Sequence, residues 1–277
     1  MLNYELPYLP KRSVKPREKG ITMVMDKGLS VRQAEELAES ASEYIDYVKF
    51  GFGTSLITKY LQNKVDIYKQ AGIKVYFGGT LFEAFIVRGM FDEFRKYIKN
   101  FKLDVLEVSD GSIELPHEEK LGYIEKLSAE FEVLSEVGSK QAGVYISENN
   151  WLKMMKNELN VGAKKVIAEA RESGNIGIYN SNGSANSTLI QEIIDHVGDQ
   201  HVIWEAPVKR QQVWFIRLLG PSVNLGNIDF HEVISLETLR LGLSGDTFFE
   251  FLPEELLKYK QTTRNLIVYS FIFFVVM

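Results

Sequence analysis

No cysteine occurs in this sequence of 277 residues. Its absence excludes disulfides, thiolate nucleophiles and cysteine metal sites, and it fits a reducing compartment, so we expect a cytoplasmic location. No basic tract is present and the formal net charge is −5, so we expect no nucleic-acid partner. The histidines are not at zinc-ligand spacing. Neither a Walker loop nor a glycine-rich dinucleotide motif before a helix occurs, which argues against nucleotide binding.

Segments for membrane insertion are lacking as well. Residues 1–20 contain prolines and scattered Lys and Arg, but no apolar core of a signal peptide, so we expect an extended N-terminal arm. Residues 266–277 are almost wholly apolar, yet this run is too short for a membrane-spanning helix. The sequence therefore predicts no membrane span.

Strand-like apolar runs alternate with amphipathic helical segments along the whole chain. We expect strands at 21–25, 47–50, 73–77, 103–108, 132–137, 165–168, 201–206 and 222–226. Eight β-α units in about 230 residues predict an α/β protein with a closed (β/α)8 TIM barrel, and a doubly wound open sheet is the alternative. No linker divides the chain, so we predict a single domain with the barrel at 21–250 and a C-terminal extension at 251–277, whose role is open.

The segment from Lys165 to Gly174 begins as a buried strand and ends in charged residues. Glu169 and Arg171 are two residues apart, so a continuing strand would point both to the same side. Burying a carboxylate beside a guanidinium costs several kcal/mol per ion unless both are paired. A structural ion pair explains this stretch as well as a functional site does, but similar polar clusters recur at the other strand exits and favour function.

Four glutamates lie inside apolar runs, each near the end of its own expected strand: Glu107, Glu136, Glu169 and Glu205. In barrel enzymes the active site lies at the C-terminal ends of the strands. Strand ends also meet water, which explains Ser109 and Asp110, but not a carboxylate within an apolar run. Four carboxylates at one mouth would repel each other without a cation, so all four are candidate Mg²⁺ ligands.

Cations and glycines at the same strand ends indicate an anionic substrate. Glycine lets backbone N–H groups approach an anion, and barrels often bind phosphate after strands seven and eight, so phosphate is the expected anion. A tight turn also needs glycine, so no single glycine decides this. The candidate substrate-binding residues are Lys27, Lys49, Gly78, Gly79, Arg171, Ser173, Asn224, Gly226 and Asn227.

Eight segments carry a family resemblance and occur in the family's order. They are DYVKFGFGTS at 46–55, GGTLFE at 78–83, LSEVGSK at 134–140, EARESG at 169–174, EAP at 205–207, QQ at 211–212, VNLGNI at 223–228 and LETLR at 236–240. Together they resemble the phosphosulfolactate synthase family over about residues 15 to 250.

The resemblance implies a Mg²⁺-dependent barrel enzyme, a carbon–sulfur lyase that adds sulfite to phosphoenolpyruvate and yields (2R)-phospho-3-sulfolactate. Archaeal members serve coenzyme M synthesis, bacterial members make sulfolactate, and a plant branch is tied to heat-stress memory. Two alternatives stay open: another lyase or aldolase of a phosphorylated acid on the same barrel, or a non-enzymatic relative acting through protein contacts. We also expect a homo-oligomer, with a trimer among the options.

In the implied reaction, sulfite attacks the methylene carbon of phosphoenolpyruvate and negative charge builds up on the substrate carboxylate. A metal bound there would stabilise this charge. A general acid must then protonate C2, and the family's candidate acid, in a Glu-Val-Gly-x-Lys motif, maps onto Lys140. Crowding by other cations is expected to lower the pKa of Lys140. Lys27, Lys49 and Arg171 are expected to hold phosphate and sulfite, and they complete the candidate catalytic set.

Two features depart from the family. Gly242-Leu243-Ser244 stands where the family commonly has Gly-Leu-Arg, so a contact of that arginine with phosphate or a neighbouring subunit would be missing. The apolar tail after about Arg264 has no recognised counterpart, and we expect it to lie outside the catalytic barrel.

Overall fold

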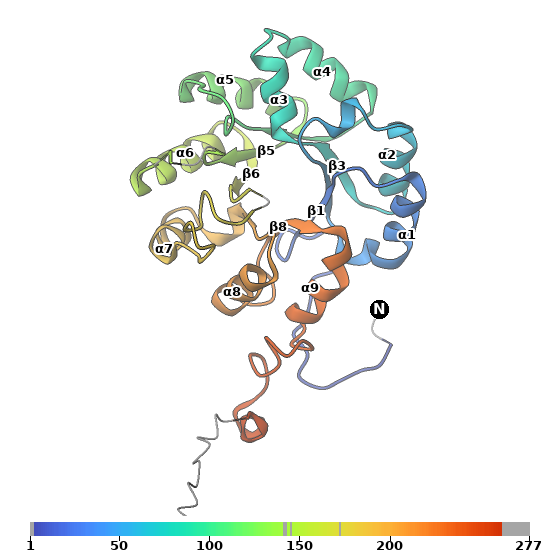
Figure 1. The fold of residues 1–277 in the computed structure, drawn as a ribbon, viewed down its shortest axis with the longest axis vertical. Coiled ribbons are helices and arrows are strands. Elements are labelled where there is room, and N and C mark those ends of the chain that lie inside the picture. Colours follow the sequence, from blue (N-terminus) through green and yellow to red (C-terminus); the bar gives the residue numbers. More distant parts are fainter. Residues whose placement is uncertain (1–2, 141–142, 145, 172, 262–277) are drawn as a thin grey trace, which may run out of the picture.

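Eight parallel strands form a nearly closed barrel in this computed structural model (Figure 1). The structure describes residues 3–140, 143–144, 146–171 and 173–261. Neighbouring strands are hydrogen-bonded in the order β3-β2-β1-β8-β7-β6-β5-β4. The strands are β1 Thr22–Asp26, β2 Tyr47–Phe50, β3 Lys74–Phe77, β4 Val105–Val108, β5 Glu132–Val137, β6 Ala163–Ala168, β7 Val202–Glu205 and β8 Leu225–Asp229.

The pairing of the first and last strands decides between the two predicted architectures. β1 pairs with β2 on one side and with β8 on the other. A doubly wound open sheet does not bring the chain's first and last strands together in this way. The hydrogen-bonded ladder runs from β3 to β4, and these two strands contact each other across the remaining seam. The predicted single-domain (β/α)8 barrel is therefore confirmed.

Helices form the outer layer around the strands (Figure 1). They are α1 Val31–Ala41, α2 Leu61–Gln70, α3 Gly79–Ile86, α4 Phe91–Asn100, α5 His117–Ser128, α6 Glu148–Asn160, α7 Ser187–His196, α8 Lys209–Leu219 and α9 Val233–Arg240. Helix α1 shows why these segments are helical. Ser30 caps its first turn by accepting a hydrogen bond from the Gln33 amide, and its buried residues recur at helical spacing.

The barrel interior places the site residues. Side chains alternate across a strand, so a residue two positions beyond an inner apolar residue also faces the interior. Leu134 lies in the inner core and is followed by Glu136, and Ile203 is followed in the same way by Glu205. Strands β2, β4 and β6 repeat this pattern. The inner face therefore changes from apolar to charged toward the C-terminal ends of the strands.

The bounds of β8 and β6 affect the predicted site residues. β8 begins at Leu225, three residues later than the expected start at 222, and the register of its pairing with β1 shifts between Thr22 and Val24. β6 ends at Ala168, and Arg171 has a positive φ of 51° in the turn that follows. The prediction that Glu169 and Arg171 project to the same side of one strand is therefore wrong.

The N-terminal arm packs against the N-terminal end of the barrel. Arg12 donates hydrogen bonds to Glu237 and to the Pro221 carbonyl oxygen, and Lys15 donates to two backbone carbonyl oxygens after α1. After α9 the chain leaves the barrel through a short 3-10 helix at Glu254–Tyr259 (Figure 1). The apolar run 266–277 lies outside the described residues. Within the described ones, no helix is both long and apolar enough to cross a membrane.

Candidate active site

A cavity of about 720 Å³ opens at the C-terminal ends of the strands. It is lined by Met25, Lys49, Phe52, Gly79, Thr80, Ser112, Glu136, Lys140, Glu169, Arg171, Ser173, Asn175, Ile176, Glu205 and Asn227. Residues from strands and loops far apart in sequence therefore meet in one place, as expected for a barrel enzyme.

Lys49 lies among the predicted carboxylates. Its Nζ is 2.9 Å from Glu107 Oε2, 3.4 Å from Glu136 Oε2 and 3.8 Å from Glu205 Oε1. Burial disfavours a charge on Lys49, but the attraction of these three carboxylates is stronger and raises its pKa well above the usual value. Lys49 is therefore a permanently charged internal counter-ion at neutral pH.

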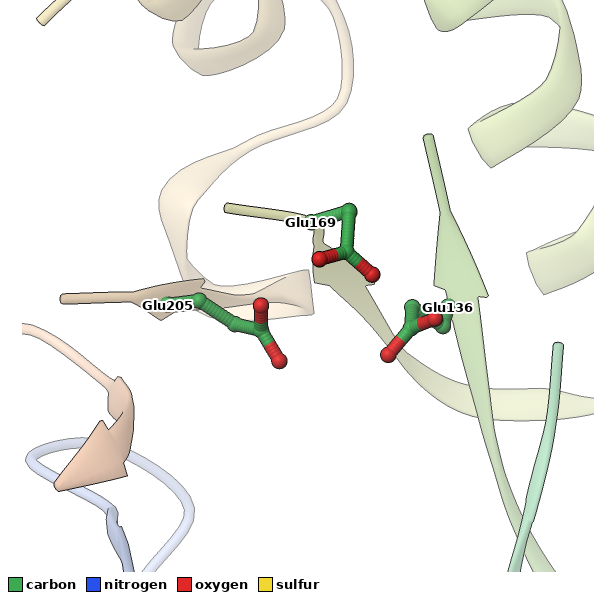
Figure 2. A group of neighbouring side chains, drawn as sticks. All are labelled: Glu136, Glu169 and Glu205. Atoms are coloured by element: carbon green, nitrogen blue, oxygen red, sulfur yellow. The ribbon is translucent and has the colours of Figure 1, made fainter. Parts of the chain in front are cut away.

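Three of the four predicted metal ligands form a carboxylate trio: Glu136, Glu169 and Glu205 (Figure 2). One oxygen of each lies within 4.8 Å of the others, and all three side chains are buried. Glu169 Oε2 and Glu205 Oε1 are buried and accept no hydrogen bond from the described residues. Buried acceptor oxygens facing one another are the donor set that Mg²⁺ prefers, so the trio fits such an ion.

The trio's pKa values are shifted in opposite directions. Burial raises the pKa of Glu205 to about 7, and burial together with the Glu136 charge raises that of Glu169 well above its usual value. Burial also opposes ionisation of Glu136, but the ammonium groups of Lys140 and Lys49 outweigh it and hold its pKa well below the usual value. Like charges this close cannot all persist without a cation or protons.

Glu107 is set apart from the trio. Its Oε1 accepts a hydrogen bond of 2.6 Å from the Gly79 amide, and its Oε2 faces Lys49. Glu107 is fully buried, and burial raises its pKa. Both of its oxygens thus contact protein groups, and it joins the start of α3 to β2.

Lys140 lies on the other side of Glu136 and forms an ion pair with its Oε1. Its Nζ is also 3.7 Å from Glu169 Oε2 and 3.7 Å from Glu83 Oε1. Burial acts against the charge, but these carboxylates outweigh it and raise the pKa of Lys140 above its usual value. The expectation of a lowered pKa is therefore wrong, because carboxylates rather than cations surround this ammonium.

Arg171 lines the cavity but does not pair with Glu169 through its guanidinium. Its backbone N–H donates to Glu169 Oε1 at 2.5 Å, and its Nη1 donates to the Lys140 carbonyl oxygen at 3.0 Å. The side chain is exposed at the mouth. One guanidinium edge thus holds the backbone of Lys140.

Besides Lys49 and Arg171, four predicted substrate-binding residues lie at or beside the cavity. Gly79, Ser173 and Asn227 line it. Asn227 has a positive φ of 54°, and its buried Oδ1 has no hydrogen-bond partner among the described residues. Gly78 lies behind Lys49, where an added Cβ would come within 3.1 Å of the lysine Cε. Gly78 therefore allows Lys49 to pass close to the start of α3.

Three other predicted residues are placed elsewhere. Lys27 is exposed and borders a separate depression with Arg32 and Lys59. Asn224 accepts a hydrogen bond from the Ile21 amide and donates one to the Val202 carbonyl oxygen, so it lies at the opposite end of the barrel. Its placement at a strand exit is wrong, because β8 begins only after it.

Gly226 lies within β8 rather than at its exit. It pairs with Glu205 of β7, and an added Cβ would come within 2.8 Å of Met23 Cε and 3.0 Å of Ile203 Cγ2. Packing inside the barrel therefore explains this glycine, and it forms no anion cradle after the strand.

Glu83 and Ser109 were absent from the predicted site. Glu83 is 2% exposed on α3, and Ser109 is fully buried at the exit of β4. The Ser109 hydroxyl lies within hydrogen-bond distance of Glu83 Oε1 and of Glu136 Oε1. A signal for Glu83 was available, because it interrupts the apolar helical run 81–86 as the glutamates interrupt their strands.

Comparisons with known proteins give the family. The model of the (2R)-phospho-3-sulfolactate synthase (ComA) family matches residues 10–246. The chain is 45% identical over 244 residues to phosphosulfolactate synthase of Bacillus subtilis (strain 168), covering 87% of this chain and 97% of that protein. It is 42% identical over 244 residues to phosphosulfolactate synthase of Methanothermobacter thermautotrophicus, covering 86% and 95%.

Solved structures share the fold. Orotidine 5'-monophosphate decarboxylase from Methanocaldococcus jannaschii, complexed with the inhibitor BMP, matches with a TM-score of 0.53 at 11% identity, covering 79% of this chain and 98% of that one. That likeness concerns the barrel alone. On the family match and the two close relatives, the chain belongs to the phosphosulfolactate synthase family of lyases.

Proposed function

We propose that this barrel adds sulfite to phosphoenolpyruvate and releases (2R)-phospho-3-sulfolactate. The observation that carries the proposal is the meeting of a protonated lysine with a buried carboxylate trio in one cavity. Lys140 supplies a proton, and Glu136, Glu169 and Glu205 supply a cation site. The reaction needs both, because it creates negative charge on the substrate and then removes it by protonation.

The bond changes balance without any further reactant. A lone pair of the sulfite sulfur forms the new bond to the methylene carbon of phosphoenolpyruvate. The π electrons of the double bond move toward C2 and the carboxylate. Lys140 then gives its proton to C2, and the phosphate ester stays intact. Solvent returns a proton to Lys140 before the next turnover.

The carboxylate trio would hold Mg²⁺. Bound there, Mg²⁺ supplies Lewis-acid stabilisation for negative charge that develops on the substrate carboxylate. Lys49 stays among these carboxylates as an internal cation, so it partly neutralises the site before substrate enters. Because Lys49 is buried and its contacts are carboxylates, it acts as a counter-ion rather than as a binder of phosphate or sulfite.

The exposed mouth of the cavity suits the anionic ends of the substrates. Arg171 and Ser173 come from the loop after β6, and Thr80 lies in the first turn of α3. A guanidinium binds phosphate or sulfite oxygens well, and a helix N-terminus favours negative charge. Arg171 also donates a hydrogen bond to the Lys140 carbonyl oxygen. The residue that binds the anion therefore also positions the backbone of the proton donor.

The test is an incubation of the full chain with phosphoenolpyruvate, sulfite and Mg²⁺, followed by mass analysis. We expect a product whose mass equals the sum of the two substrates. Omission of sulfite is the control, because another lyase would consume phosphoenolpyruvate without it. A correctly folded protein that forms no adduct would overturn the proposal. The expected homo-oligomer and the cytoplasmic location stay predictions.

A further inference from the structure

The Ser109 hydroxyl lies between two carboxylates and one ammonium. It is within hydrogen-bond distance of Glu83 Oε1 and, at 2.8 Å, of Glu136 Oε1. It accepts a hydrogen bond of 3.1 Å from Lys140 Nζ. A hydroxyl has one proton to donate, so it serves one carboxylate while its lone pair binds the lysine. The hydrogen bond to Ser109 therefore orients the Lys140 ammonium group.

Glu83 completes this arrangement from α3. Its Oε1 lies 3.7 Å from Lys140 Nζ and accepts a hydrogen bond from the Ser112 amide at 3.3 Å. Its Oε2 is buried and has no hydrogen-bond partner among the described residues. A buried carboxylate needs a charged or hydrogen-bonding partner, and Lys140 is the ammonium in contact with Glu83.

The same β4 exit also holds the backbone of Lys140. The Lys140 amide donates to the Gly111 carbonyl oxygen at 2.8 Å. Gly111 lies against the lysine stem, because an added Cβ there would come within 3.0 Å of Lys140 Cγ. Backbone, stem and tip of Lys140 thus contact the segment from Ser109 to Gly111.

Among the described residues, Glu83 is the carboxylate partner of Lys140 that lies outside the trio. When Glu136 and Glu169 share a cation, their attraction for Lys140 falls, and Glu83 with Ser109 remains to hold the ammonium. We propose that Ser109 and Glu83 form a clamp that keeps the Lys140 ammonium aimed at the substrate, and that both are positioning residues. The inference rests on the proposed role of Lys140 as proton donor.

The chain contains a matched control for this clamp. Ser135 donates to Glu158 Oε2 at 2.6 Å, and Lys120 Nζ lies 2.9 Å from Glu158 Oε1. This second Ser–Glu–Lys cluster is also buried, but none of its three residues lines the cavity. Lys120 also donates to the Glu136 carbonyl oxygen and to Asp110, so the control is made at Ser135 and not at Lys120. Ser135→Ala imposes the same chemical change as Ser109→Ala without removing a hydrogen bond to Lys140.

The first measurement is steady-state kinetics of Ser109→Ala and Glu83→Gln. Displacing a catalytic group by about 1 Å can lower a rate by roughly 100-fold, so we expect kcat to fall about 10- to 100-fold with little change in KM. Adding Ser109→Ala to Lys140→Met should cause no further loss, because the group it positions is already gone. Additive losses would mean a general structural role and would overturn the clamp.

The second measurement does not depend on activity. Each protein is treated with an N-hydroxysuccinimide ester of acetate at one pH, and acetylation of Lys140 is followed by peptide mass analysis. Loss of the clamp should make Lys140 react several-fold faster in Ser109→Ala and Glu83→Gln, whereas Ser135→Ala should leave it unchanged.

The two measurements separate the clamp from the proposed function. If the unaltered chain forms no adduct but Lys140 labelling rises in the variants, the clamp stands and the proposed function falls. If Lys140 labelling and kcat both stay at the level of the unaltered chain, the clamp is overturned while the proposed function stands. If only labelling stays unchanged, the loss of kcat comes from another effect and the clamp is again overturned.

Discussion

The charge around Lys140 sets the kind of acid it can be. Its ammonium faces Glu136, Glu169 and Glu83, and these raise its pKa above the usual lysine value. Such a group is protonated at any physiological pH but gives up its proton reluctantly. A carbanion developing at C2 of a phosphorylated acid is a far stronger base than water, so a reluctant acid can still protonate it. Because the Lys140 ammonium is a weak acid, it also keeps its proton in contact with solvent until sulfite has attacked.

Replacement of Lys140 tests this role. General acid catalysis is typically worth about 10²–10⁴-fold, so Lys140→Met should lower kcat by roughly that factor while keeping the packing of the stem. Turnover is measured at saturating phosphoenolpyruvate and sulfite, with circular dichroism to verify folding. Lys153→Met, on the exposed face of α6, is the matched control. A folded Lys140→Met protein with unaltered kcat would exclude Lys140 as the acid.

Removal of divalent cations tests the carboxylate trio. Exhaustive EDTA treatment should abolish turnover, and Mg²⁺ should restore it, if the buried oxygens of Glu136, Glu169 and Glu205 hold the proposed Mg²⁺. Glu169→Gln and Glu205→Gln should each weaken Mg²⁺ binding, so that half-maximal activity requires a higher Mg²⁺ concentration. Full turnover of the metal-stripped protein would contradict a metal-dependent reaction.

Single residues were predictable where a charge interrupted an apolar strand. Glu136, Glu169 and Glu205 were found in this way, because alternation places every second strand residue inside a barrel. Glu83 gives the same kind of signal on a helix, but helical spacing alone does not tell which turn reaches the mouth. Asn224 was misplaced because the strand was expected at 222–226, whereas β8 begins only at Leu225 and leaves Asn224 before the strand, at the opposite end of the barrel.

The N-terminal arm shows how an element outside the β-α repeat joins the barrel. Arg12 Nε lies 2.8 Å from Glu237 Oε1, and its other nitrogens donate to the Pro221 and Gly20 carbonyl oxygens. Both charged side chains are largely buried. The sequence predicted an arm but not this attachment, because the partners are separated from it by most of the chain.

Loss of this attachment should lower stability rather than activity. Arg12→Ala removes the donor to Glu237 and to the Gly20 carbonyl oxygen, while the Pro221 carbonyl oxygen keeps its hydrogen bond from Arg240. We therefore expect the free energy of unfolding to fall by about 1–3 kcal/mol. Urea unfolding followed by circular dichroism measures this change, with exposed Lys11→Ala as the control. Equal midpoints for the two variants would show that the arm is not coupled to barrel stability.

His117, at the junction of α5 and α6, makes the free energy of unfolding depend on pH. Burial, together with the Lys120 ammonium, lowers the pKa of His117. Because the folded protein disfavours protonated His117, the unfolded chain binds this proton more readily. The free energy of unfolding is therefore unaffected by His117 protonation above about pH 6.5 and decreases as the pH falls below that value.

Unfolding measured between pH 7 and pH 5 tests this. The free energy of unfolding of the unaltered chain should fall more steeply over this range than that of His117→Gln. His196→Gln serves as control, because His196 is exposed near the end of α7. If the free energy of unfolding depends on pH with the same slope in the unaltered chain and in His117→Gln, His117 does not contribute to the pH dependence of stability.

At the scale of the whole molecule, alternation of apolar runs and amphipathic segments was enough to predict a barrel. Eight units of this kind can close only if the first and last strands meet, and β1 and β8 do pair. Closure also brings the strand ends to one mouth, so a cavity there followed from the fold. Which loops line the cavity did not follow, because loops such as that after β6 take conformations that no periodicity encodes.

The C-terminal boundary is the remaining question at this scale. The barrel's last helix ends at Arg240, and the described chain then continues through Glu254–Tyr259 away from the strands. Arg264 and the apolar run 266–277 lie beyond the described residues. A run with this composition favours aggregation wherever it is exposed. We therefore expect a chain ending at Arg264 to fold with the same unfolding midpoint and to be at least as soluble.

Urea unfolding and light scattering of the two chains, compared at equal concentration, test this expectation. The shortened chain should keep its turnover as well, because the described residues that line the cavity lie at or before Asn227. A shortened chain that precipitates or unfolds earlier would show that the tail stabilises the protein. A shortened chain that stays folded but loses turnover would place a residue after Arg264 at the mouth of the barrel.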